Sequence, residues 1–298
     1  MAWLQLFIDA GERRVALEDA LDTLGALAVT LRDGADTPVL EPGPGETPLW
    51  AEVELCALFP EHSDPALIRE ALRARLDISE LPPHHFEPLA EKQWERAWLD
   101  AFGPMRFGRH LWIMPHDHEA EEIDPAAAIV RLDPGLAFGT GTHPTTALCL
   151  RWLDAHPPRR QQVIDYGCGS GVLALAAARL GATRVLATDN DPQALTATLE
   201  NARRNALDGR IECIEPEALQ NTPADLVMAN ILAGPLLALR PCLTRLTRPG
   251  GQLLLSGMLA SQATQVCNDY RDDFDFGPPQ DMDGWTLLAG RRAPAEGG

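Results

Sequence analysis

Short apolar runs alternate with alanine- and leucine-rich stretches through the second half of the chain. The runs at 161–164, 184–189, 224–230 and 252–257 have the length of buried strands, and helical sequences such as 172–180 lie between them. Strands that alternate with helices predict a parallel sheet with right-handed crossovers and helices on both faces. We therefore expect a doubly wound, Rossmann-like α/β domain.

The first 90 residues have a different pattern. Alternation predicts strands at 3–9, 26–31 and 49–58, and helical periodicity predicts helices at 15–24 and 66–76. This β-α-β-β-α order predicts a small α+β domain of the ferredoxin-like type.

Prolines and aromatic residues mark the junction between these two halves. Three prolines within 81–89 predict a boundary, and residues 91–102 predict a short helix with aromatic side chains at four-residue spacing. We expect three parts: an α+β domain at 1–90, a linker helix at 91–103 and an α/β domain at 104–298.

The most informative motif is a glycine-rich turn between the first α/β strand and its helix. Gly167, Gly169 and Gly171 form G-x-G-x-G. Glycines allow the backbone to approach a ligand that a Cβ atom would keep away. A dinucleotide fingerprint has its third glycine one residue later, so this spacing favours S-adenosylmethionine (AdoMet). The alternative is an ordinary tight turn without a ligand.

Polar side chains end the next strands and strengthen the cofactor interpretation. Asp189 follows the glycine turn by about 20 residues, where a carboxylate can accept hydrogen bonds from both ribose hydroxyls. Helix capping is the alternative role, but Asn190 or Asp191 can perform it. Asn230 ends a later strand. Ligands of open parallel sheets lie beyond the carboxyl ends of the strands, so we expect Gly167, Asp189 and Asn230 in one crevice.

A segment rich in glycine and threonine, residues 133–146, precedes the first strand of the sheet. Ordering such a loop is costly, and loops of this kind often carry function. We expect it to cover the methionine end of the cofactor; a plain connection is the alternative. His143, within this loop, has either a structural role or a contact with the substrate.

Composition and charge narrow the class of partner. The chain has 298 residues and a net charge of −18, and its first 90 residues hold 17 acidic residues against six arginines. Such a protein repels nucleic-acid phosphates, so base-specific nucleic-acid binding is not expected. It can attract a basic protein, although acidity can also serve solubility alone.

The cysteines and the remaining histidines do not predict redox or metal chemistry. Six scattered cysteines lack C-x-x-C spacing and read as reduced thiols, and Cys168 is expected to pack rather than to react. The pairs His84, His85 and His116, His118 lack metal-site spacing, so we expect solvated loops and no metal. Without a signal peptide or a membrane-spanning run, we expect a cytoplasmic protein.

These motifs together resemble one family of enzymes. The loop 137–146, the turn 165–171, Asp189 and the Asn-Ile-Leu-Ala run at 230–233 are similar to the ribosomal protein L11 methyltransferases of the PrmA type. The resemblance covers most of the chain. It implies AdoMet contacts at Thr145, Gly167, Asp189 and Asn230. It also implies methylation of lysine ε-amino groups and an α-amino group of ribosomal protein L11. We expect residues 1–90 to capture the substrate.

Amine methylation by AdoMet requires positioning more than a catalytic dyad. A sulfonium methyl group is already activated, so the protein must hold a neutral amine in line with it and exclude water. An oxygen near Asn230 can orient the amine nitrogen, but the sequence identifies no proton acceptor. Enzymes that methylate planar base nitrogens have Pro-Pro and an aromatic residue after the asparagine. Here Ile231 and Leu232 follow, which argues against nucleic-acid bases.

Three alternatives stay open at this point. A nicotinamide-dependent dehydrogenase would share Asp189 but should have the later third glycine. A non-catalytic protein on the same fold should have lost cofactor contacts. A methyltransferase acting on another protein or on a small-molecule amine would share every cofactor residue.

Overall fold

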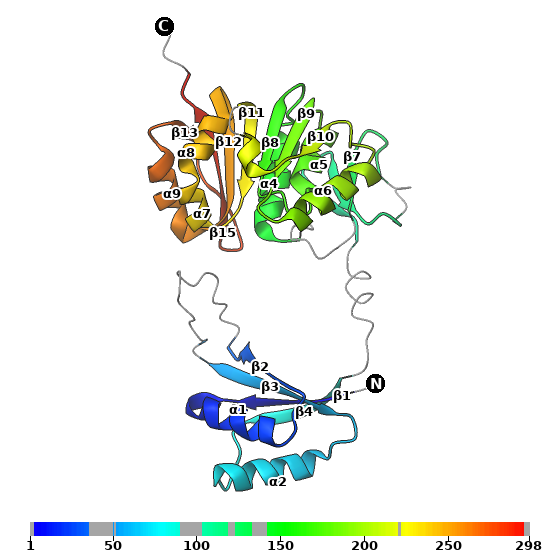
Figure 1. The fold of residues 1–298 in the computed structure, drawn as a ribbon, viewed down its shortest axis with the longest axis vertical. Coiled ribbons are helices and arrows are strands. Elements are labelled where there is room, and N and C mark those ends of the chain that lie inside the picture. The colour runs from blue at the N-terminus through cyan, green and yellow to red at the C-terminus, as the bar shows by residue number, and fades with distance from the viewer. Residues whose placement is uncertain are drawn as a thin grey trace. The chain divides into compact units, whose positions relative to one another are not determined.

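A computed structural model of the protein describes residues 3–35, 50, 52–89, 103–118, 123–132, 142–219 and 222–294. The chain divides into two compact units, Met1–Ala97 and Trp98–Gly298 (Figure 1). The expected linker helix lies outside the described residues. The domain limits at 90 and 104 therefore stay predictions.

The first unit is a four-stranded antiparallel sheet with two helices. Its elements are β1 (Trp3–Asp9), α1 (Arg14–Thr23), β2 (Ala28–Asp33), β3 (Val53–Pro60), α2 (Pro65–Leu76) and β4 (His84–Leu89). The sheet order β2-β3-β1-β4 and this chain order make the ferredoxin-like fold that the pattern predicts.

Strand β4 corrects the expectation of a loop-like boundary at 81–89. It pairs with β1 at one edge of the sheet, where a strand needs hydrogen bonds along one side only. Pro88 is tolerated there because an edge strand can lack an N–H. His84 and His85 therefore lie on a strand rather than in a solvated loop, and the ring of His85 stacks on Phe7 at 4.8 Å.

The core of the first unit joins the sheet to both helices. Leu6 on β1 and Leu55 on β3 are fully buried, as are Leu17 on α1 and Leu72 on α2. Burying each of these side chains contributes about 1.5–3 kcal/mol relative to leaving it exposed. This unit therefore has a hydrophobic core of its own.

The second unit is a doubly wound α/β domain, as predicted. The sheet order is β10-β9-β8-β11-β12-β15-β13, with β14 paired to β15. Its strands are β8 (Gln162–Tyr166), β9 (Arg184–Thr188), β10 (Ile211–Cys213), β11 (Ala224–Asn230), β12 (Thr247–Leu259), β13 (Phe274–Phe276), β14 (Gln280–Met282) and β15 (Trp285–Arg292). Strands β8 to β12 are parallel, whereas β15 runs antiparallel between β12 and β13.

Helices cover both faces of this sheet. One buried cluster includes α4 (Pro144–Ala155), α5 (Val172–Arg179) and α6 (Pro192–Arg204), and the other includes α7 (Ala233–Ala238), α8 (Arg240–Leu246) and α9 (Ala263–Tyr270). Figure 1 shows α7, α8 and α9 grouped together in yellow and orange. Among the helices in the described ranges, none is both long and apolar enough to cross a membrane.

A three-stranded sheet precedes the large sheet along the chain of the second unit and was not predicted. It consists of β5 (Met105–Phe107), β6 (Leu111–Met114) and β7 (Ala128–Arg131). The buried carboxylate of Asp154 on α4 accepts backbone N–H groups from Arg109, His110 and Leu111, at 2.5, 2.9 and 2.9 Å. These bonds fix the small sheet to α4.

Candidate active site

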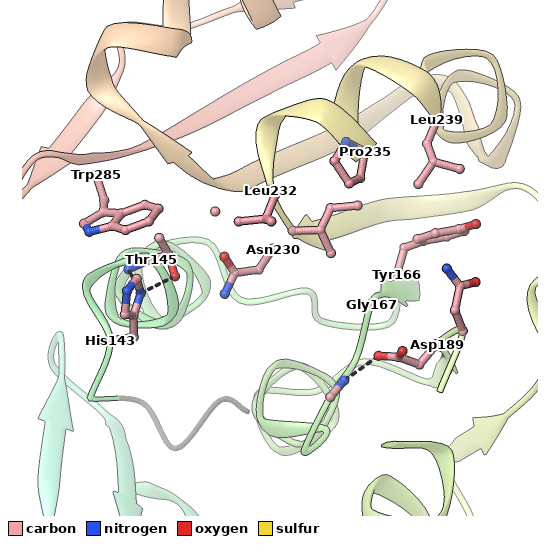
Figure 2. A pocket seen from close by; sticks show the side chains of 14 residues that line it. His143, Thr145, Tyr166, Gly167, Asp189, Asn230, Leu232, Pro235, Leu239 and Trp285 are labelled. Atoms are coloured by element: carbon pink, nitrogen blue, oxygen red, sulfur yellow. Dashed lines mark hydrogen bonds between the residues drawn. The ribbon is translucent and has the colours of Figure 1, made fainter. Parts of the chain in front are cut away.

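A cavity of about 580 Å³ opens at the carboxyl ends of β8, β9 and β11 (Figure 2). This volume lies within the range of roughly 300–1,000 Å³ that is usual for small-molecule sites. Thr145, Gly167, Asp189 and Asn230, the four residues expected to contact the cofactor, all line it. The rule for parallel sheets therefore located the crevice correctly.

The glycine turn forms the floor of this cavity. Gly167, Gly169 and Gly171 have φ angles of +78°, +53° and +80°, in the left-handed region that favours glycine. A Cβ atom at Gly167 would lie 2.5 Å from Cγ2 of Ile231 across the cavity wall. The turn therefore brings bare backbone to the cavity, which is the cradle that a nucleoside cofactor requires.

Asp189 lies at the end of β9 and faces the glycine turn. Its Oδ2 accepts the backbone N–H of Gly169 at 3.0 Å, and its Oδ1 accepts that of Asp191 at 3.0 Å. Asp191 caps α6, because its Oδ1 accepts the N–H of Gln193 at 2.8 Å. The helix cap is thus a separate residue, and the Asp189 carboxylate keeps further lone pairs for ribose hydroxyls.

The start of α4 brings Thr145 to the opposite end of the cavity. His143 is the N-cap of this helix: its Nδ1 accepts the N–H of Thr145 at 3.4 Å and lies 2.8 Å from Thr145 Oγ1. Burial lowers the pKa of His143. Its ring also meets Trp285 edge-on, with 4.8 Å between the ring centroids.

The helix start corrects the prediction that residues 133–146 form one loop. Pro144 occupies the first helical position, where its missing N–H costs nothing, so residues 144–146 are helical. A proline directly after a capping residue is the sequence signal that marks this helix start. Residues 133–141 lie outside the described ranges. That this segment covers the methionine end of the cofactor therefore stays a prediction.

Asn230 ends β11, where the chain turns away from the sheet. Its Nδ2 donates a hydrogen bond to Oγ1 of Thr146 at 3.3 Å. The N–H of Ile231 donates to the carbonyl oxygen of Ser256 at 3.1 Å, which fixes the turn against β12. Gly257, with φ of +87°, follows on β12, and a Cβ atom there would overlap the backbone of Ile231. Glycine at 257 is therefore needed for Asn230 to reach the cavity.

Apolar side chains form the remaining wall, and sequence reasoning missed them as a group. They come mainly from the turn after Asn230 and from α7, and Figure 2 shows Leu232, Pro235 and Leu239 along one side. Trp285 closes the end near Thr145. It comes from β15, far along the chain, and no local motif marks it. Leu232 is 53% exposed, so the mouth of the cavity offers an apolar surface to an incoming chain.

Comparison with known proteins identifies the enzyme class that fits this geometry. The family model described as ribosomal protein L11 methyltransferase (PrmA) matches residues 2–293. The chain belongs to the PrmA family. This confirms the resemblance carried by the glycine turn, Asp189 and the 230–233 run, and it favours a methyltransferase over the dehydrogenase and the non-catalytic protein.

Similar PrmA proteins span the whole chain. A ribosomal protein L11 methyltransferase of Pseudomonas paraeruginosa is 51% identical over 98% of this chain and 99% of the relative. One from Azotobacter vinelandii is 50% identical over 98% of this chain and 100% of the relative. The crystal structure of a ribosomal protein L11 methylase from Lactobacillus delbrueckii subsp. bulgaricus is 34% identical, with a TM-score of 0.59 over 64% of this chain and 100% of that chain.

The PrmA chain is an AdoMet-dependent protein methyltransferase, and the cavity fits that cofactor. Gly167 and Gly169 present bare backbone to the cavity, where a ligand can approach closely. The paired oxygens of Asp189 suit a diol, and the apolar wall suits a base. Cys168 is buried within the turn and accepts a hydrogen bond from Thr198 Oγ1 at 3.3 Å, and burial raises the pKa of its thiol, as a packing role requires.

Beneath the glycine turn of this PrmA chain lies a buried carboxyl group, Asp165. It is 1% exposed, and its Oδ2 accepts the N–H of Ala174 at 2.9 Å. Burial raises the pKa of Asp165 from 3.8 to about 7, the hydrogen bond from Ala174 opposes this, and the charge of Asp189 adds to it. The native state therefore retains a proton on Asp165 at pH values where the unfolded chain has lost it.

Replacing Asp165 with asparagine should make stability less dependent on pH. Between about pH 4 and pH 7 native Asp165 binds more protons than the unfolded residue, so its contribution lowers the free energy of unfolding by up to ~1.4 kcal/mol per pH unit as pH rises, and levels off above the native pKa. Urea unfolding at pH 5, 6, 7 and 8 should show Asp165→Asn gaining stability relative to wild type as pH increases. A gap that stays constant with pH would contradict the proposed titration.

Proposed function

We propose that this enzyme transfers methyl groups from AdoMet to amino groups of ribosomal protein L11, at lysine ε-amino groups and at an α-amino group. The observation that carries the proposal is the match to the PrmA family over nearly the whole chain. The convergence of Thr145, Gly167, Asp189 and Asn230 on one cavity supports it. Contact of these four residues with AdoMet belongs to the same proposal.

The chain's own residues position both reactants. When bound, AdoMet supplies a methyl group that its sulfonium charge has already activated. Asp189 would hold the ribose hydroxyls, and Thr145 and Gly167 would hold the cofactor at the two ends of the cavity. Asn230, which lies between them, would orient the amine through its amide oxygen.

The apolar wall prepares the substrate amine. A free lysine has a pKa near ~10.4 and is charged at neutral pH. Placing it against Leu232 and Trp285 removes water, and desolvation favours the neutral, nucleophilic form. Oδ1 of Asn230 can then accept one N–H of the amine and direct its lone pair along the cavity.

The first unit fits the role of substrate capture. Its excess of acidic residues gives it charge complementarity with a protein that binds ribosomal RNA and therefore carries basic surface. A ribosomal protein as substrate also supports a cytoplasmic location. The role of residues 1–90 and this location are both part of the proposal.

The proposal is tested by intact mass of purified ribosomal protein L11 after incubation with enzyme and AdoMet. We expect increases in steps of one methyl group, and no increase with Asp189→Ala. If the mass stays unchanged while calorimetry shows AdoMet binding, the substrate is a different protein or a small-molecule amine.

A further inference from the structure

The side chain of Asn230 is held at one end only. Its Nδ2 donates to Thr146, while its Oδ1 is buried in the wall of the cavity and accepts no hydrogen bond from the described residues. Figure 2 shows this side chain pointing into the cavity beside Thr145. Nearly every buried polar atom in a folded protein is hydrogen-bonded, so an acceptor left alone in a cavity wall indicates a ligand that donates.

The orientation of the Asn230 amide decides whether it can assist the reaction. Its oxygen accepts hydrogen bonds, whereas its nitrogen only donates them. A substrate amine brings N–H groups, so only the oxygen can bind it and orient its lone pair. The last torsion of asparagine has a broad, roughly two-fold preference that hardly distinguishes the two orientations. A neighbouring group must therefore fix the choice.

Thr146 is that neighbouring group. It is 1% exposed and lies in the first turn of α4. Its hydroxyl oxygen accepts the hydrogen bond from Asn230 Nδ2, so this contact holds the nitrogen end of the amide and leaves the oxygen end for a donor.

The helix turn that carries Thr146 is itself fixed to the sheet. Oγ of Ser256, which is fully buried on β12, lies within hydrogen-bonding distance of the carbonyl oxygens of Thr145 and Thr286, at 3.4 and 3.0 Å. The contact with Thr145 thus ties the first turn of α4 to the residue of β12 that pairs with Asn230.

We infer that Thr146 is a positioning residue for methyl transfer: its hydroxyl holds the Asn230 amide with Oδ1 directed at the incoming amine. The inference rests on the proposed methylation of amines. Thr146 does not line the cavity, so it acts through Asn230 and touches neither reactant. Its neighbour Thr145 lines the cavity and has a different role.

The test compares Thr146→Val, which keeps the shape of the side chain, with Thr146→Ser, which keeps the hydroxyl. The valine variant should lower kcat on ribosomal protein L11 by roughly 10- to 100-fold, with the AdoMet dissociation constant changed less than about threefold. The serine variant should stay within about threefold of wild-type kcat. Wild-type kcat in the valine variant, or equal losses in both variants, would overturn the inference.

A double-mutant cycle supplies a readout that a purely structural role would not move. In an Asn230→Ala enzyme, adding Thr146→Val should lower kcat no further, whereas independent effects would multiply and overturn the inference. Thr247→Val is the matched control, because Thr247 is also fully buried, donates to the carbonyl oxygen of Leu243 at 2.9 Å and lies outside the cavity lining. Its kcat should equal that of wild type.

Two further measurements keep the outcome decisive. Circular dichroism establishes that each variant folds, and Thr146→Ala takes the place of valine in the cycle if the valine variant does not. Wild-type enzyme is assayed first on ribosomal protein L11. Its activity decides the proposed function, and the Thr146 variants then decide the inference separately.

Discussion

Alanine in place of Asp189 is expected to raise the dissociation constant for AdoMet by roughly 100-fold or more, because hydrogen bonds from two ribose hydroxyls to a carboxylate contribute about 1.5–3 kcal/mol each. The fold should persist. The two backbone N–H groups that lose an acceptor, those of Gly169 and Asp191, lie at the partly exposed edge of the crevice, where water can replace the carboxylate. Isothermal titration calorimetry measures the affinity, and thermal unfolding measures the stability.

The adjacent aspartate supplies a matched control for this prediction. Asp191→Ala removes the cap of α6 and should lower stability by about 1 kcal/mol, yet it should leave AdoMet affinity within about twofold of wild type. An unchanged dissociation constant for Asp189→Ala would refute the ribose role. Equal losses of affinity in both variants would show that this acidic turn acts as a structural unit instead.

Removing the first unit, so that the chain begins at Trp98, should abolish methylation of ribosomal protein L11 while leaving AdoMet binding within about threefold of wild type. The first unit has its own core, and all the described residues that line the cavity belong to the second unit. Losing a separate binding module costs roughly 10²- to 10⁴-fold in effective affinity, which should appear in kcat/KM. Calorimetry and intact mass measure the two properties on the same preparation.

A short lysine peptide at high concentration is the control for the truncation, since it needs only the cavity. The full-length and truncated enzymes should methylate it at the same slow rate. Turnover of ribosomal protein L11 by the truncated chain at the full-length rate would contradict the division of roles between the two units.

Strong periodicity made most of the fold predictable. The strand at 3–9 and the helix that follows the glycine turn were predicted almost to the residue. The candidate site was predictable for a related reason, because residues at the carboxyl ends of parallel strands must meet at one edge. Asp189 and Asn230 follow this rule, although they lie on different strands.

The missed features depend on contacts between distant parts of the chain. Strand β4 contains Pro88 and became a strand because β1 offers it an edge to pair with. The short strands β5, β6 and β7 are too brief to show a period. Trp285 enters the cavity only because β15 returns beside β12, which neither its neighbours nor its spacing reveals. In each case tertiary pairing outweighs local pattern.

The position of β15 sets an order of events during synthesis. This strand follows every other strand of its sheet along the chain, yet it lies between β12 and β13. A growing polypeptide can complete the ferredoxin-like unit early, because all its strands precede residue 90. In the large sheet, by contrast, β12 and β13 have no strand between them until β15 has been synthesised. Domains fold broadly in the order in which they are made. The wall that carries Trp285 is thus among the last parts of the enzyme to be assembled, and a nascent chain stalled before it should have no working catalytic centre.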